Sequence, residues 1–294
     1  MRKYLDAYAP SLGELWLVVM VLFCIGGSLV SAAVAIVIDF LFNLDPDVSK
    51  TVIVGLYPLG FCLVIPFVLF RAKEQYQRNI FAHKPNYASP SPHFGKLPIT
   101  LVFLLLLVLV PLFNTATEPL SMWIPMPEVM KNLFATITQS GWISFITVVV
   151  MAPVLEEWLL RGVALKGLLQ AGASPAYAIG WSALMFGVMH MNPWQAIPAI
   201  LMGMLFGWVY WRTRSLWTTI FMHAVNNGTA FFIGLFFPDL PEDVSTLDLV
   251  GRHNYSWVLA IAVLASILVI WLLHKKLAPA ACLFKREEQP VVAP

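Results

Sequence analysis

Apolar runs long enough to cross a bilayer recur along the whole sequence and constrain the fold more than any other feature. A bilayer core is about 30 Å thick, so a spanning helix needs roughly 20 apolar residues. The runs that approach this length are 15–42, 51–70, 97–113, 142–160, 175–190, 194–211, 216–237 and 256–273. With 12% charged residues, the chain is too apolar for a soluble globular protein, in which about 25% are charged. We therefore predict an all-α fold, a polytopic membrane helix bundle of about eight transmembrane helices.

The basic residues predict the orientation of these helices. Cytoplasmic loops of membrane proteins are enriched in Lys and Arg. If the amino terminus is cytoplasmic, only Lys50, Lys131 and Arg252 of the 18 basic residues fall on the outer side. We therefore expect both termini in the cytoplasm. The net charge of +2 is too small to indicate a nucleic-acid partner, so the lipid bilayer is the expected surrounding.

One apolar run is interrupted by three charged side chains, Glu156, Glu157 and Arg161. An ionised group inside a membrane helix costs about 2.5 to 3.5 kcal/mol even on a lenient scale, so it marks a candidate functional site. Residues at i and i+4 share a helix face, which predicts that Glu157 pairs with Arg161. Glu156 then faces elsewhere and is free to act as a general base, unless it belongs to a structural ion pair of its own.

Further polar side chains occur inside apolar runs, namely His190, His223 and Asn227. At 1.5 Å per residue, Glu156 lies about 21 Å from the outer boundary, and His190 and His223 lie about 10 Å from the inner one. This count assumes that the fourth helix continues past the membrane until Gly172 ends it. The four polar groups are then predicted at one level, in the cytoplasmic half of the membrane.

Three short motifs lie in order on successive predicted helices: Glu156-Glu157-x-x-x-Arg161, Phe186-x-x-x-His190 and His223-x-x-x-Asn227. Together they resemble the motifs of the CPBP family, which comprises the type II CAAX prenyl endopeptidases and bacterial relatives that act in bacteriocin processing or self-immunity. The resemblance covers residues 142–237, and the first three helices and the last one carry no motif.

This resemblance implies an intramembrane endopeptidase that hydrolyses a peptide bond of a membrane-associated substrate, prenylated or small and hydrophobic. By the family pattern, Glu156 and His190 would activate a water molecule, and His223 and Asn227 would stabilise the oxyanion. Glu157 and Arg161 would support them. The bacterial relatives suggest an inner-membrane location.

We expect one integral membrane domain with three parts. Residues 1–141 form the N-terminal transmembrane helices and loops, 142–237 form the catalytic helices, and 238–294 form the last transmembrane helix and a cytoplasmic tail.

Zinc is an alternative centre for the same residues. Glu156, His190 and His223 could ligate it, because catalytic zinc sites commonly combine histidines, a carboxylate and a water molecule. However, no His-Glu-x-x-His helix places two ligands on one face. Asn227 lies one turn from His223, and two neutral donors side by side suit an oxyanion. We therefore expect no obligatory metal.

Two other functional classes remain open. A transporter would also bury Glu, Arg and His beside a water-filled path, and it predicts flux of an ion or solute. A non-catalytic scaffold or immunity factor would keep the hydrogen bonds between helices but would not need the Glu156 carboxylate.

Overall fold

The computed structural model describes residues 1–82 and 91–277, and all regular elements in these ranges are helices. The label η marks π-helical or 3₁₀-helical segments. In chain order the elements are α1 (Arg2–Ala7), α2 (Leu12–Trp16), η1 (Leu17–Gly27), α3 (Ser28–Phe42), α4 (Pro46–Gly55), η2 (Tyr57–Phe61), α5 (Val64–Phe81), α6 (Ile99–Thr117), η3 (Glu118–Leu120), α7 (Glu128–Gln139), α8 (Gly141–Ser144), η4 (Phe145–Met151), α9 (Ala152–Glu157), η5 (Trp158–Leu165), α10 (Lys166–Gln170), α11 (Pro175–Met189), α12 (Pro193–Thr213), α13 (Leu216–Phe236) and α14 (Thr246–Lys276).

Several consecutive elements join into helices long and apolar enough to cross a membrane. Five such units are present in the described ranges: Leu12–Phe42, Pro46–Phe81, Ile99–Leu120, Gly141–Gln170 and Thr246–Lys276. The all-helical fold is therefore confirmed for the described residues, with five candidate membrane spans. Helix α11 has only 15 residues, and α12 and α13, with 21 residues each, carry more polar side chains. The total of about eight spans thus stays a prediction.

The fourth unit continues without interruption from Gly141 to Gln170, as the sequence predicted. It ends at Gly172, whose φ of +92° lies in the left-handed region that favours glycine. The next helix begins at once, because the Ser174 side chain accepts a hydrogen bond from the Tyr177 amide and Pro175 occupies the first turn. The chain therefore reverses tightly, and α11 packs against η5.

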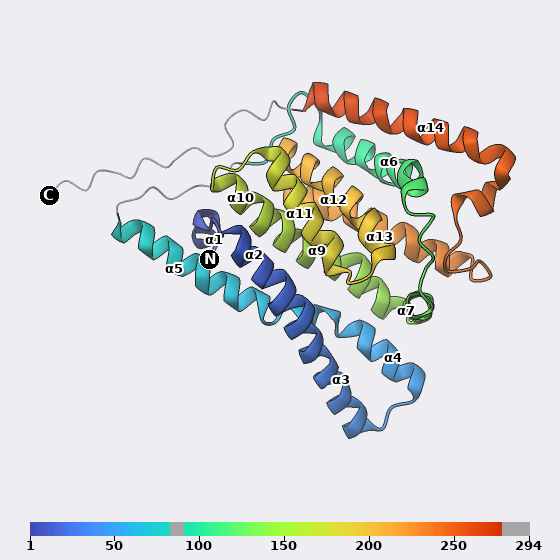
Figure 1. The fold of residues 1–294 in the computed structure, drawn as a ribbon, viewed down its shortest axis with the longest axis horizontal. Coiled ribbons are helices and arrows are strands. Elements are labelled where there is room, and N and C mark those ends of the chain that lie inside the picture. Colours follow the sequence, from blue (N-terminus) through green and yellow to red (C-terminus); the bar gives the residue numbers. More distant parts are fainter. Residues whose placement is uncertain (83–90, 278–294) are drawn as a thin grey trace.

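Helices α11 and α12 form a close antiparallel hairpin in the centre of the bundle (Figure 1). A Cβ atom at Gly187 would lie 2.5 Å from Ile200 Cγ1, and one at Gly203 would lie 3.0 Å from Ala183 Cα. Such short approaches require glycine, as is common where membrane helices pack through small residues. The close packing also brings the backbone of α12 near the fourth unit.

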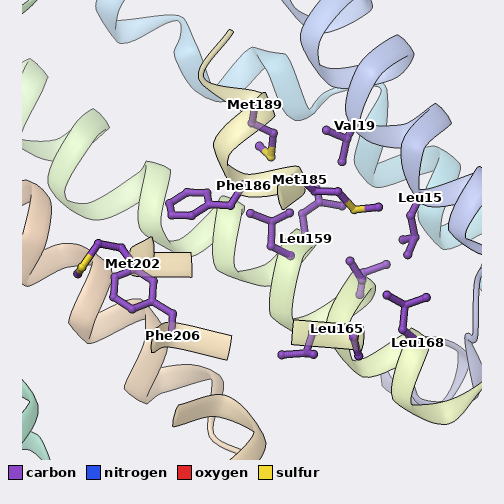
Figure 2. Close-up of a cluster of buried hydrophobic side chains, with 14 of the residues drawn as sticks. Leu15, Val19, Leu159, Leu165, Leu168, Met185, Phe186, Met189, Met202 and Phe206 are labelled. Atoms are coloured by element: carbon purple, nitrogen blue, oxygen red, sulfur yellow. The ribbon is translucent and has the colours of Figure 1, made fainter. Parts of the chain in front are cut away.

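A shared apolar core holds these central helices against the first unit (Figure 2). Leu15 of α2, Leu159 of η5 and Met185 of α11 are all fully buried in it. Phe186 and Phe206 belong to this core and also contact Arg161 of η5 and His223 of α13. Packing of this kind fixes the orientation of the helices that carry the motifs.

The second unit is not one regular helix, because the 3₁₀ turn η2 separates α4 from α5. This turn packs tightly against η1. A Cβ atom at Gly27 would lie 2.5 Å from the Gly60 carbonyl oxygen, and one at Gly60 would lie 3.1 Å from the Phe23 ring. The glycine contact thereby holds η2 at a fixed place beside α9.

Candidate active site

A buried ion pair forms the centre of the site. Arg161 Nη1 donates to Glu157 Oε1 at 2.7 Å, and both side chains are 0% exposed. The pairing that the i,i+4 spacing predicted is therefore confirmed. Arg161 Nη2 also donates to the Gly203 carbonyl oxygen at 3.0 Å, which ties η5 to α12.

The same Glu157 oxygen also holds an imidazole. His223 Nδ1 of α13 lies 3.0 Å from Glu157 Oε1, and His223 is buried. One carboxylate therefore joins Arg161 and His223, a link that the sequence analysis did not predict.

Two aromatic rings enclose this cluster. The Arg161 guanidinium carbon lies 5.0 Å from the Phe186 ring centroid and 5.4 Å from that of Phe206. The Phe186 ring also lies 5.2 Å from each of the imidazole rings of His190 and His223. Phe186, whose motif position was noted without a role, thus brings the two histidines against one ring and shields the cation from water.

Hydrogen bonds define which nitrogen of each imidazole carries a proton. His190 follows the last residue of α11, and its Nδ1 lies 2.9 Å from the Phe186 carbonyl oxygen. A carbonyl can only accept, so Nδ1 must donate, and Nε2 of the neutral ring is left as an acceptor. The same reasoning applies to His223, whose Nδ1 faces a carboxylate oxygen. His223 Nε2 can therefore donate only when both ring nitrogens carry a proton. The sequence analysis had instead expected His223 to be a neutral donor beside Asn227.

Glu156 is buried and points away from the ion pair, as the 100° rotation between adjacent helical residues requires. The Tyr57 hydroxyl of η2 donates a hydrogen bond to Glu156 Oε1. Within the described residues, Glu156 has neither an ion pair nor a hydrogen bond to His190 or His223. The sequence analysis missed Tyr57, because it lies in a helix without a motif, and the only local signal was the Tyr57-Pro58 pair inside an apolar run.

A row of carboxamides orients Asn227. Asn227 Nδ2 donates to the Val148 carbonyl oxygen at 2.9 Å, and its Oδ1 accepts from Asn226 at 3.1 Å. Asn226 in turn accepts from Asn114 of α6 at 2.8 Å. In the π-helical segment η4 each backbone amide donates to the carbonyl five residues earlier. By this pattern the Val148 carbonyl would accept from residue 153, but residue 153 is a proline and has no amide hydrogen. The Asn227 side chain replaces that missing donor, which leaves it one N–H for a ligand.

The residues considered for zinc do not form a metal site. No group of three or more His, Cys, Asp or Glu side chains in the described ranges is arranged to hold a metal ion. Glu156 accepts a hydrogen bond from Tyr57, whereas His223 is hydrogen-bonded to Glu157. The set Glu156, His190 and His223 therefore does not fit zinc in this arrangement.

Two apolar grooves lie elsewhere, along α13. They enclose about 600 and 570 Å³, are lined almost wholly by apolar side chains and share Phe221 and Ala224. Glu156, His190 and His223 line neither groove. The buried polar cluster, and not groove size, therefore identifies the candidate site.

Comparison with known proteins identifies the segment that contains this cluster. No curated protein and no solved structure matches the chain. Residues 138–229 match the family model described as "Type II CAAX prenyl endopeptidase Rce1-like", and this range includes every predicted site residue from Glu156 to Asn227. This match over residues 138–229 agrees with the resemblance of the three motifs to the CPBP family of intramembrane proteases.

Proposed function

We propose that this chain is an intramembrane endopeptidase in which Glu156 activates a water molecule for attack on a peptide bond. One observation carries the proposal: inside the Rce1-like segment, Glu157 is paired with Arg161, whereas Glu156 is a buried carboxylate that forms no ion pair with any described residue. A carboxylate in this setting can take a proton from water in a region of low dielectric constant. If the two glutamates served only to pair with Arg161, Glu157 alone would be sufficient and Glu156 would not be needed.

In the proposed reaction the water oxygen attacks the carbonyl carbon of the substrate while its proton passes to Glu156. His190 is suited to hold the same water, because its Nδ1 proton is fixed by the Phe186 carbonyl and its Nε2 is left to accept. The tetrahedral intermediate then collapses, the C–N bond breaks, and Glu156 returns the proton to the leaving amine. Atoms and charges balance without any additional reactant.

The negative oxygen of the intermediate requires donors, and Asn227 offers the N–H that Val148 does not use. The family pattern assigns the second donor to His223, which would have to carry a proton on Nε2 as well as on Nδ1. We expect Asn227→Ala to lower kcat by about 10²- to 10³-fold, as for loss of one oxyanion donor elsewhere, with little change in KM. Steady-state kinetics on detergent-purified protein measure both; an unchanged kcat would contradict the role of Asn227.

The substrate in this proposal is a membrane-associated peptide, prenylated or hydrophobic, cut in the cytoplasmic half of a bacterial inner membrane. The family supports this class of substrate, and the apolar surroundings of the site suit an occupant that already lies in the bilayer. No step uses a metal ion. Prolonged chelation with EDTA or 1,10-phenanthroline is therefore expected to leave the rate unchanged; a loss restored by zinc alone would contradict that assignment.

The test is hydrolysis by purified protein in lipid vesicles. Two peptides are compared, a farnesylated one ending in Cys and three further residues and a non-prenylated transmembrane one, in water enriched in ¹⁸O. Mass spectrometry should find a new C-terminal carboxylate that carries ¹⁸O and does not appear with Glu156→Gln. Absence of cleavage of both peptides would contradict the peptidase and favour the scaffold, whereas solute flux that depends on Glu156 would favour the transporter.

A further inference from the structure

We propose that Tyr57 is a positioning residue for the base: its hydroxyl holds one oxygen of Glu156 and directs the other toward the reacting water. This inference rests on the proposed peptidase function and extends it beyond the matched segment. Tyr57 lies in the second membrane unit, whereas the Rce1-like segment begins at residue 138. A helix without any motif would thus complete the site.

The hydrogen-bond pattern around the carboxylate supports this role. Tyr57 donates to Glu156 Oε1, and Oε2 has no hydrogen-bond partner among the described residues. A free glutamate side chain has three rotatable bonds and populates many rotamers. Anchoring one oxygen restricts this freedom, so the other oxygen points in a constant direction.

Tyr57 is itself held firmly. Its ring contacts Phe23 of η1 at 6.1 Å between centroids and Phe61 at 6.3 Å, and both contacts are edge to face. The contact between Gly27 and Gly60 fixes the turn that carries it. Irregular backbone at membrane depth is tolerated only where protein buries it or where it lines a cavity. The 3₁₀ turn meets this condition, since Gly60 and Phe61 are both buried.

The phenol also suits the charge of the base. A phenol hydroxyl carries no charge, so it can anchor the Glu156 carboxylate without pairing it with a cation. Phenylalanine at position 57 would retain the ring contacts and remove only this donor. Tyr57→Phe therefore separates the hydrogen bond from the packing.

The experiment compares Tyr57→Phe with wild type in the vesicle assay, using whichever of the two peptides wild type cleaves. We expect kcat to fall about 10- to 100-fold, as for loss of a hydrogen bond to a charged group, with KM within twofold and an unchanged melting temperature. The matched control is Tyr8→Phe, because Tyr8 also donates to a glutamate, Glu14 Oε1, at 2.9 Å, but in α1–α2 away from the site. This control should retain full activity.

A second pair of variants tests whether Tyr57 acts through Glu156. Glu156→Asp shortens the carboxylate and removes it from the phenol, so adding Tyr57→Phe should then cost less than threefold. A kcat of Tyr57→Phe within twofold of wild type would overturn the role of Tyr57, and so would an equal loss of kcat in both backgrounds. If wild type cleaves neither peptide, the proposed function and this inference fail together; if Glu156→Gln is inactive while Tyr57→Phe is normal, only the inference fails.

Discussion

At the scale of single residues, the two adjacent glutamates have entirely different environments. Glu157 is paired with Arg161 and His223, whereas the hydrogen-bond partner of Glu156 among the described residues is the neutral phenol of Tyr57. The spacing rules of a helix predicted the first pair and the different direction of Glu156. They could not predict Tyr57 or the His223 contact, because these depend on how separate helices pack and not on any local pattern.

The ion pair gives a prediction about stability. Arg161→Ala leaves Glu157 buried without its main partner, and breaking a buried pair from one side costs about 3 to 5 kcal/mol. We expect a lower melting temperature in detergent and a lower yield of folded protein. Arg78→Ala is the control, because Arg78 forms an exposed pair with Glu74, and such pairs contribute at most about 1 kcal/mol. Equal melting temperatures for Arg161→Ala and Arg78→Ala would show that the buried pair does not stabilise the fold.

At the scale of elements, the apolar runs predicted where the long helices lie. The points at which the helical backbone is interrupted within a run were less predictable. The run 51–70 was predicted as one span, but the structure divides it at η2 between α4 and α5. The run 175–190 was predicted to end at His190, and α11 ends one residue earlier, at Met189, with His190 as the capping residue. Hydrophobic periodicity reports which residues avoid water, and it does not report a change of backbone geometry within a run.

The break at η2 leads to a prediction about its packing. A Cβ atom at Gly27 would meet the backbone of Gly60 at 2.5 Å, and backbone cannot move aside as a flexible side chain can. Gly27→Ala should therefore displace η2, move Tyr57 away from Glu156 and lower kcat by about tenfold or more. The vesicle assay measures this change.

Gly180→Ala in α11 provides the matched control. A Cβ atom at Gly180 has no neighbour within 4 Å, and alanine favours helix over glycine by about 1 kcal/mol. Full activity is expected for this variant. A Gly27→Ala protein as active as Gly180→Ala would mean that the position of η2 does not matter for the reaction.

At the scale of the whole molecule, the candidate site is hydrogen-bonded to helices outside the segment that carries the motifs. Tyr57 bonds to Glu156, and Asn114 bonds to Asn226, so hydrogen bonds cross the predicted boundary between residues 1–141 and 142–237. The division into three parts was drawn from motifs alone, and motifs do not show which neighbouring helices complete a site. The predicted cytoplasmic tail lies outside the described residues from 278 onward.

The orientation in the membrane gives a prediction for the whole chain. With Cys24, Cys62 and Cys282 replaced by serine, single cysteines are introduced at two exposed positions, Lys96 and Asp239. The positive-inside rule predicts that an impermeant thiol reagent applied to intact cells labels Asp239→Cys and not Lys96→Cys. Permeabilised cells should show labelling of both. The reverse pattern in intact cells would place the site in the outer half of the membrane.

The most direct test of the central claim is the single-turnover rate of Glu156→Gln against wild type, with yield and melting temperature matched. Glutamine has nearly the same shape as glutamate but cannot take a proton from water at neutral pH. We predict a rate at least about 10²-fold lower, with the variant still folded in the membrane. A Glu156→Gln protein within threefold of the wild-type rate would contradict the claim that this carboxylate activates the water.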